Sequence, residues 1–211
     1  LHIITLPNFI VNENEDDRRF QYGHKFEVDY GIKNSGTWTT LDNGDMIWRL
    51  GVKSEGAYAM KLQFDQFYIP QGANIVIYNE FKDIVYGPYT SNDNSNRTFG
   101  APLIGGEVLI IEYYQPSDYS EEVELNINSI IHDYTDIFHF QENRDRNCGY
   151  NVVCDDAQEF RDQSNSVIYM IINQYTCSGT LINNVNNDNT PYVLTAWHCI
   201  VGETNLNEHN D

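Results

Sequence analysis

The 211-residue sequence is poor in positive charge, and this shortage is the first constraint on its function. Its 12 lysines and arginines stand against 31 aspartates and glutamates, so the formal net charge is −19 and the isoelectric point is near 4.4. Nucleic acid and anionic lipid both need a cationic protein surface, so we expect neither as a partner. Hydrophobic residues make up 41% of the chain, which is enough for a packed core and argues against wholesale disorder.

Long apolar segments are also missing. The longest apolar runs, around Val108–Ile111 and Val167–Ile172, have the length of a strand and fall short of the ~18–20 residues that span a bilayer. We therefore expect no membrane segment. The chain opens at Leu1 without a basic stretch followed by an apolar one, so we expect that any signal peptide is not part of this chain.

Cysteine and lysine are absent from opposite parts of the chain. Lysine does not occur after Lys82, whereas all four cysteines, Cys148, Cys154, Cys177 and Cys199, lie in the last third. Two regions of such different composition indicate two modules. An even number of cysteines outside any Cys-x-x-Cys pattern favours disulfides, and hence a secreted protein, extracellular or periplasmic. The alternative, four reduced and buried thiols in a cytosolic protein, stays open.

The first module has the pattern of an all-β domain. Met60–Asp65 and Val123–Asn128 alternate apolar and polar residues with the period of two that is typical of a half-buried strand. Asn74–Tyr78 and Glu107–Tyr114 are further short strands, with turn residues between them and no convincing helical stretch. This spacing predicts an antiparallel β-sandwich or jelly roll over about residues 36–135.

The composition predicts the domain boundaries. We expect an N-terminal domain over residues 1–140, a polar linker over 141–147 and a second domain over 148–211. Near this boundary, His132, Asp133, Asp136 and His139 offer donor atoms for a metal ion. We favour a solvated linker there, so the sequence predicts no metal ligands.

The second module contains a strand–loop–strand unit. We expect strands over Val167–Ile172, Thr180–Ile182 and Tyr192–Thr195, with the polar segment Asn183–Thr190 as a loop between the last two. This part of the chain therefore also begins as antiparallel β-structure.

Two cysteines bracket this unit. Cys177 and Cys199 are 22 positions apart, at the start of one hairpin strand and just after the end of the other, so a bridge between them is geometrically reasonable. Closing such a loop contributes about 3 kcal/mol by the chain-entropy estimate. The bridge would also fix the adjacent His198. We expect His198 to be held rigidly at the end of a buried strand, which would give it the fixed position that a general base requires, and histidine has a pKa near neutrality.

These motifs resemble a known family. Cys177–Ile182 followed by Leu194–Cys199 is similar to the strand pair around the catalytic histidine of trypsin-like, chymotrypsin-fold serine proteases. The wider stretch Asn147–Cys199 resembles bacterial lysyl endopeptidases more specifically. More weakly, residues 46–116 resemble the amino-terminal pro-region of such proteases.

The resemblance implies a fold and residue roles. Residues 148–211 would be the first strands of a chymotrypsin-like β-barrel, preceded by a β-sandwich pro-domain. Cys177 would bond to Cys199, and Cys148 and Cys154 would bond to cysteines further along the protease domain. His198 would be the general base of a Ser-His-Asp triad.

The implied function is that of a secreted serine endopeptidase precursor. It would hydrolyse polypeptide substrates through an acyl-enzyme and need no cofactor, and its pro-domain would pack on the protease domain. The sequence departs from the family pattern because it has no Gly-Asp-Ser-Gly-like segment, and Asp211 lies too close to His198 to match the family's aspartate. We therefore expect the triad's aspartate and serine downstream, and no activity from this chain alone.

Arg144 and Arg146 are candidate processing sites. They lie in the polar linker just before Cys148, and proteolytic processing needs an exposed, flexible segment. Since no lysine follows Lys82, autocatalytic cleavage here would imply a preference for arginine. Processing by another protease is the equal alternative.

Two other classes of function stay open. The β-sandwich would serve as a secreted binding or adhesion module if the protease part were a degenerate, non-catalytic remnant. A weaker interpretation is an inhibitor that imitates a pro-region and acts on a separate protease.

Overall fold

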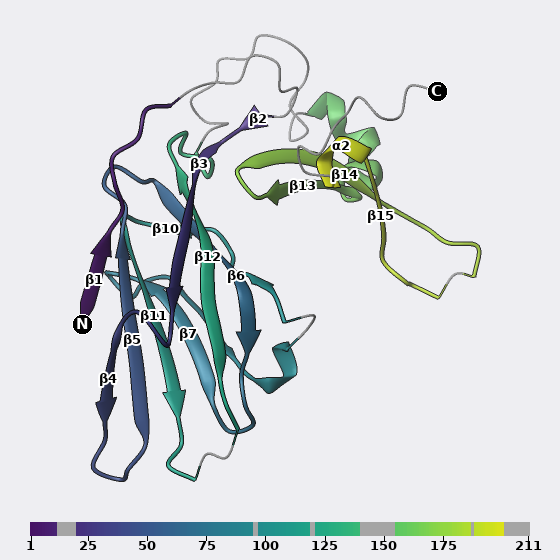
Figure 1. Ribbon diagram of the computed structural model, residues 1–211. Helices are drawn as coiled ribbons and strands as arrows, with labels where there is room; N and C mark the ends of the chain where they lie inside the picture. The colour runs from purple at the N-terminus through teal and green to yellow at the C-terminus, as the bar shows by residue number, and fades with distance from the viewer. Residues whose placement is uncertain (12–19, 95–96, 119–120, 140–154, 187, 201–211) are drawn as a thin grey trace, which may run out of the picture. The chain divides into compact units, whose positions relative to one another are not determined.

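The computed structural model describes the chain except for residues 12–19, 95–96, 119–120, 140–154, 187 and 201–211. The chain divides into two compact units. The first unit comprises Leu1–Asn12 and Gly23–Ile137, and the second comprises Glu13–Tyr22 and Phe138–Asp211. Strands dominate the described parts of both, which confirms the all-β class (Figure 1). No helix in these described parts is long and apolar enough to cross a lipid bilayer.

The first sheet of the first unit has six strands. They are β1 (His2–Thr5), β4 (Thr37–Thr40), β5 (Met46–Lys53), β7 (Asn74–Asn79), β8 (Val85–Tyr89) and β11 (Val108–Gln115). Their order is β1-β5-β11-β7-β8, and β4 also pairs with β5. All pairs are antiparallel except β1 with β5, which is parallel.

The second sheet of this unit has five strands, all antiparallel. They are β3 (Gly23–Gly31), β6 (Ala59–Tyr68), β9 (Phe99–Gly100), β10 (Ile104–Gly105) and β12 (Glu124–Asp133). Their order is β10-β6-β12-β3, with β9 also on β6. A single turn of 3-10 helix, η1 (Ser91–Asp93), is capped by Thr90.

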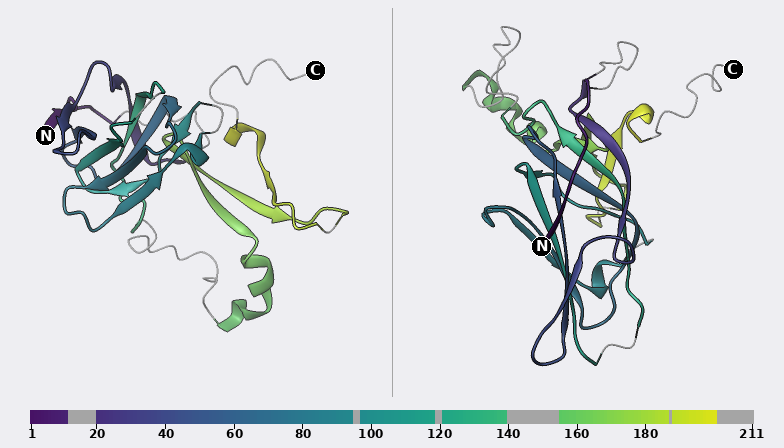
Figure 2. Two further views of the ribbon diagram at one scale, coloured as in Figure 1. Left: turned by 90° about the horizontal axis from the view of Figure 1, so that it is seen from below. Right: turned by 60° about the vertical axis from the view of Figure 1, so that its left-hand side comes forward.

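One hydrophobic core joins the two sheets into a sandwich (Figures 1 and 2). Trp48, Leu50 and Val52 alternate along β5 and are buried, as the period of a strand requires. Leu62 of β6 and Ile130 of β12 belong to the same core cluster from the other sheet. The expected β-sandwich is therefore present, with one parallel strand pair that the sequence pattern did not indicate.

The sandwich is larger than the expected range of about 36–135. Strands β1 and β3 lie before residue 36, and Phe26 of β3 is part of the core. Val85–Tyr89, for which the sequence analysis gave no strand, is strand β8. Strand β12 runs on to Asp133 past an irregularity between Ile127 and Ser129. Such a bulge shifts the alternation of side chains, so the pattern in the sequence stops before the strand does.

The second unit has a smaller sheet. Its strands are β2 (Phe20–Gln21), β13 (Val167–Ile172), β14 (Tyr175–Ile182) and β15 (Tyr192–Thr195), in the order β13-β14-β15 with β2 also on β14. Short helical segments accompany it: η2 (Asp155–Phe160), α1 (Arg161–Ser164) and α2 (Trp197–Ile200). All its strand pairs are antiparallel, as expected.

Candidate active-site histidine and its disulfide

The site is built on the hairpin of β14 and β15. Gly179 lies opposite Thr195 at the open end of the ladder, away from the connecting loop, and the Thr195 Oγ1 donates a hydrogen bond of 2.8 Å to the backbone carbonyl of Ser178. A Cβ at position 179 would lie 3.0 Å from Val193 Cγ1 and 3.2 Å from Ile168 Cγ1, so these two side chains would have to shift slightly to admit a residue larger than glycine. Strands β13 and β15 thus crowd β14 from both sides where the site begins.

A disulfide joins β14 to the short helix that follows β15. Cys177 of β14 and Cys199 of α2 are bonded, with their Cα atoms 6.1 Å apart. Cys199 is buried, and its N–H donates to the carbonyl of Ala196 at 3.0 Å, which closes the turn from β15 into α2. The structure thus contains the bridge that the hairpin pattern suggested.

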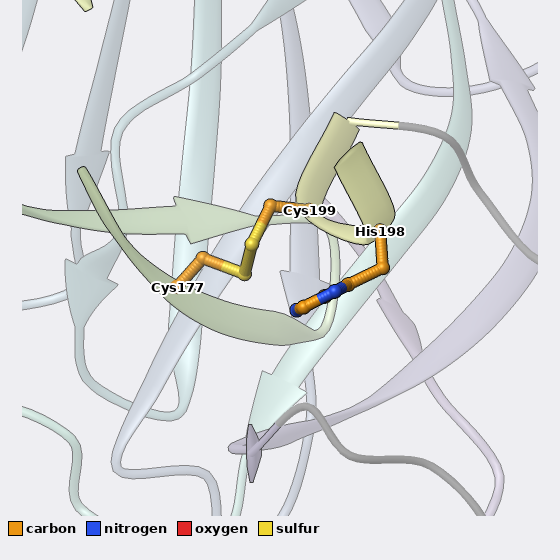
Figure 3. Close-up of side chains that lie close together, drawn as sticks. All are labelled: Cys177, His198 and Cys199. Atoms are coloured by element: carbon orange, nitrogen blue, oxygen red, sulfur yellow. A yellow bond between two sulfur atoms is a disulfide. The ribbon is translucent and has the colours of Figure 1, made fainter. Parts of the chain in front are cut away.

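His198 lies in α2, one residue before the bridged cysteine. Its side chain is exposed and extends from the short helix toward the strand that carries Cys177, beside the disulfide (Figure 3). The donor atoms of Cys177, His198 and Cys199 all lie within 4.8 Å of one another. The covalent bond between Cys177 and Cys199 limits how far α2 can move relative to β14, and the exposed imidazole beside it is open to a group brought in from solvent.

The same three residues are the one group of potential metal ligands found among the described residues. Both sulfur atoms are in the disulfide, however, and metal binding needs thiolates. With the bridge intact, only the imidazole of His198 is left as a ligand. The oxidised site therefore suits proton transfer better than metal binding.

Most large apolar side chains of this sheet are exposed. On β15, Tyr192, Val193 and Leu194 are 50%, 45% and 59% exposed, and Trp197 of α2 is 65% exposed. The expectation that the histidine follows a buried strand is therefore wrong for this structure. Within the described residues of the second unit, β15 has no layer packed over it.

A strand from the beginning of the chain also reaches this sheet. Phe20 and Gln21 form β2, which pairs with Thr176 and Tyr175 of β14. The sequence analysis did not find this strand, because a run of two residues has no periodicity to detect.

The histidines near the expected boundary have a different role from the one we predicted. His132 and Asp133 are 3% and 0% exposed at the end of β12, so they do not belong to a solvated linker. Ser54 Oγ and His132 Nδ1 are 2.7 Å apart, and Asp133 accepts hydrogen bonds from the N–H groups of Thr135 and Ile137. Burial lowers the pKa of His132 to about 4 and raises the pKa of Asp133. These groups close one end of the sandwich, and they are not brought together with His198 in one unit.

Four of the predicted site residues lie outside the described residues. They are the candidate processing residues Arg144 and Arg146 and the early cysteines Cys148 and Cys154. Their roles stay predictions.

A comparison with known protein families gives one match. Residues 143–210 match the family model described as the lysyl endopeptidase C-terminal domain. The matched range contains all four cysteines, His198 and both linker arginines. This part of the chain is therefore related to the lysyl endopeptidases, a protease family, and the candidate histidine belongs to the related part.

Proposed function

We propose that this chain is part of a secreted serine endopeptidase precursor, in which His198 is the general base. The observation that carries the proposal is the position of His198: it is exposed, held beside the Cys177–Cys199 disulfide, and lies in the region that matches the lysyl endopeptidase model. A catalytic histidine needs access to a substrate and a restrained backbone, and the exposure of His198 and the disulfide at the next residue support this role.

The proposed reaction is hydrolysis of a peptide bond. The imidazole of His198 takes the proton of a serine hydroxyl as the serine oxygen attacks the carbonyl carbon, and then gives that proton to the leaving amine. Water next hydrolyses the acyl-enzyme with the same histidine as base. The serine, and the aspartate that holds the imidazole in the correct tautomer, are proposed to lie beyond residue 211.

The exposed apolar sheet supports this proposal. In the described part of this sheet Leu194 and Trp197 are largely exposed, as apolar side chains are on a surface that other polypeptide covers. Further polypeptide of the same protease, packed over β15, would cover these side chains and bring the nucleophile to His198. Cys148 and Cys154 would form disulfides with that downstream part.

The first unit is proposed to be the pro-domain. It has its own hydrophobic core between two sheets. A domain that folds before the enzyme does would need such a core. Cleavage in the segment that contains Arg144 and Arg146 would then separate it from the protease.

The test uses the full-length product of the gene, purified after secretion. We expect it to hydrolyse peptide p-nitroanilides with lysine or arginine before the scissile bond, and we expect His198→Ala to lower kcat by at least about 10³-fold. His139→Ala is the matched control, because this exposed histidine of the same unit has no proposed role in the reaction. A folded full-length protein that hydrolyses none of these substrates, or a His198→Ala variant with wild-type kcat, would refute the proposal and favour a non-catalytic binding module.

A further inference from the structure

The edge of β14 next to the candidate histidine is shared by two strands. Strand β13 pairs along one edge of β14 from Tyr175 to Thr180. On the opposite edge, β15 pairs with Gly179–Ile182, and β2 pairs with Tyr175 and Thr176. Strand β2 must lie on the β15 side, because β13 already occupies the other side of both residues.

Strand β2 is also anchored beyond its two ladder pairs. The N–H of Tyr22 donates to the carbonyl of Gln174 at 2.9 Å, and the Tyr22 hydroxyl donates to the carbonyl of Asn173 at 2.8 Å. Tyr22 is fully buried. Asn173 has a positive φ of 51°, which belongs to the tight turn between β13 and β14. The segment Phe20–Tyr22 is thus fixed to the end of β14.

The register places β2 close to the disulfide. Phe20 lies opposite Thr176, and Thr195 lies opposite Gly179, so three steps along β14, or roughly 10 Å, separate the two pairs. Cys177, the neighbour of Thr176, is bonded to Cys199 beside His198. Both β2 and β15 are antiparallel to β14 and therefore run in the same direction. Strand β2 therefore occupies the same edge of β14 as β15 does, beyond the point where the chain leaves that edge to form α2.

An extended polypeptide next to His198 would need this same edge. The free edge of a strand recognises extended peptides through main-chain hydrogen bonds, with little regard to sequence. A segment of this chain already makes such contacts there.

We propose that Phe20–Tyr22 are an internal occupant of a peptide-binding edge of β14, and that they keep other extended polypeptides off this edge until β2 is displaced. The ligand class is an extended peptide backbone. The consequence for hydrolysis, namely that β2 restrains the enzyme, rests on the proposed function of His198. The claim that β2 occupies the edge of β14 is independent of that function.

A pair of proline substitutions tests the occupation. The N–H of Tyr22 donates to β14, and successive N–H groups of a strand point to opposite sides. The N–H of Phe20 therefore faces β14, whereas the N–H of Gln21 faces away from it. Phe20→Pro removes a ladder donor, whereas Gln21→Pro introduces the same ring without removing one. The probe is a fluorescein-labelled synthetic peptide with the sequence of residues 16–25, and its binding to the 211-residue chain is followed by fluorescence anisotropy.

We expect the Phe20→Pro chain to bind this peptide at least tenfold more tightly than the wild-type and Gln21→Pro chains do. Equal affinities for all three chains, or no binding to Phe20→Pro, would overturn the proposal. Non-reducing mass spectrometry checks that each variant keeps the Cys177–Cys199 bridge. If Phe20→Pro does not fold, Tyr22→Phe, which removes the hydroxyl that donates to Asn173, replaces it; wild-type affinity for this variant would equally overturn the proposal.

A second experiment uses the full-length precursor to test whether β2 restrains hydrolysis. We expect Phe20→Pro to raise the rate of p-nitroanilide hydrolysis by the uncleaved precursor severalfold over Gln21→Pro, with no change after the pro-domain is removed. If the mature protein is active but the two precursors hydrolyse equally, the restraint by β2 is wrong and the proposed function stands. If the mature protein is inactive, the proposed function fails, and the peptide-binding result still decides whether β2 occupies the edge.

Discussion

The two units use the same kind of strand but differ in how their apolar side chains are covered. In the first unit, residues such as Trp48 and Leu62 lie between two sheets and are almost completely buried. In the second, Tyr169, Leu194 and Trp197 belong to one sheet and its flanking helix and are more than half exposed. Strand pairing alone therefore does not make a core, since a second layer must cover the apolar face.

This difference indicates two sources of stability. The first unit depends on buried apolar area, which contributes about 25 cal/mol per Å². The second unit has few buried side chains in its described part, so its hairpin depends on the disulfide between Cys177 and Cys199. Four measurements test this difference between the two units.

The largest effect is expected from a cavity in the sandwich. Trp48→Ala removes a side chain that is 1% exposed and whose Nε1 donates to the carbonyl of Ser35 at 2.8 Å. Removing a buried aromatic side chain costs about 3–5 kcal/mol. Urea unfolding followed by circular dichroism measures the loss of unfolding free energy.

Leu194→Ala is the matched change in the second unit. Because Leu194 is 59% exposed, we expect a change within about 0.5 kcal/mol. A loss above about 1 kcal/mol would contradict the comparison, since it would mean that β15 packs against another surface in solution.

The next effect is expected from the disulfide. Replacing both cysteines, Cys177→Ser with Cys199→Ser, should destabilise the hairpin by about 3 kcal/mol, the estimate for a loop of this size. Hydrogen–deuterium exchange should accelerate in β14 and β15 and stay unchanged in β11. Faster exchange in both units would show that the sandwich depends on the bridge and would remove the distinction between them.

Acid should weaken the first unit through His132. Desolvation is the main cause that lowers the pKa of this side chain to about 4; the charge of His24 lowers it further, and that of Glu107 opposes the shift. Since an unfolded histidine titrates near 6.5, the unfolded state binds more protons between pH 6.5 and 4. This contribution to stability is therefore complete above pH 6.5 and is lost as the pH falls toward 4, on the order of 2 kcal/mol.

The variant His132→Gln isolates this effect. Glutamine keeps a polar partner for Ser54 but does not titrate, so the difference between wild type and variant excludes Asp133, whose raised pKa acts in the opposite direction. Melting temperatures of both proteins at pH 7, 6, 5 and 4 provide the measurement. Parallel pH profiles would rule out His132 as the acid-sensitive group.

The smallest expected effect compares one carboxylate from each unit. In the first, Glu112 accepts hydrogen bonds from Arg49 Nε at 2.6 Å and from the Tyr78 hydroxyl at 3.2 Å on a face of the first sheet. We expect Glu112→Gln to cost about 1 kcal/mol. In the second, Asp188 accepts from the N–H of Thr190 at 3.0 Å in an exposed loop, and we expect Asp188→Asn to shift the melting temperature less. The reverse order would show that the exposed loop carries more of the stability than the packed sheet does.

The sequence pattern was most informative where alternation is regular. Strands β13 and β15 have the predicted bounds, and β6, β7 and β11 lie where period-two runs or apolar segments predicted them. The pattern failed for β3 and for the end of β12, where Ile130 and His132 follow the bulge. There the burial of a residue depends on the opposite sheet, which local alternation does not contain.

For the candidate site, short motifs predicted more than periodicity did. The spacing of Cys177 and Cys199 around a hairpin indicated a bridge and a fixed His198, and the structure contains the bridge. The sequence did not indicate β2, because the pairing of Phe20 with Thr176 joins residues far apart in the chain. The buried pair of Ser54 and His132 was missed for the same reason.

Residue types and short spacings were sufficient to predict the all-β class, the hairpin around Cys177 and His198, and the likeness of this region to a protease family. The folded chain was needed to show which strands form each sheet, that His132 is buried, and that β2 completes the edge of β14. Backbone hydrogen bonds between strands carry almost no sequence information. The choice of partner is made by packing and by the connections of the whole chain.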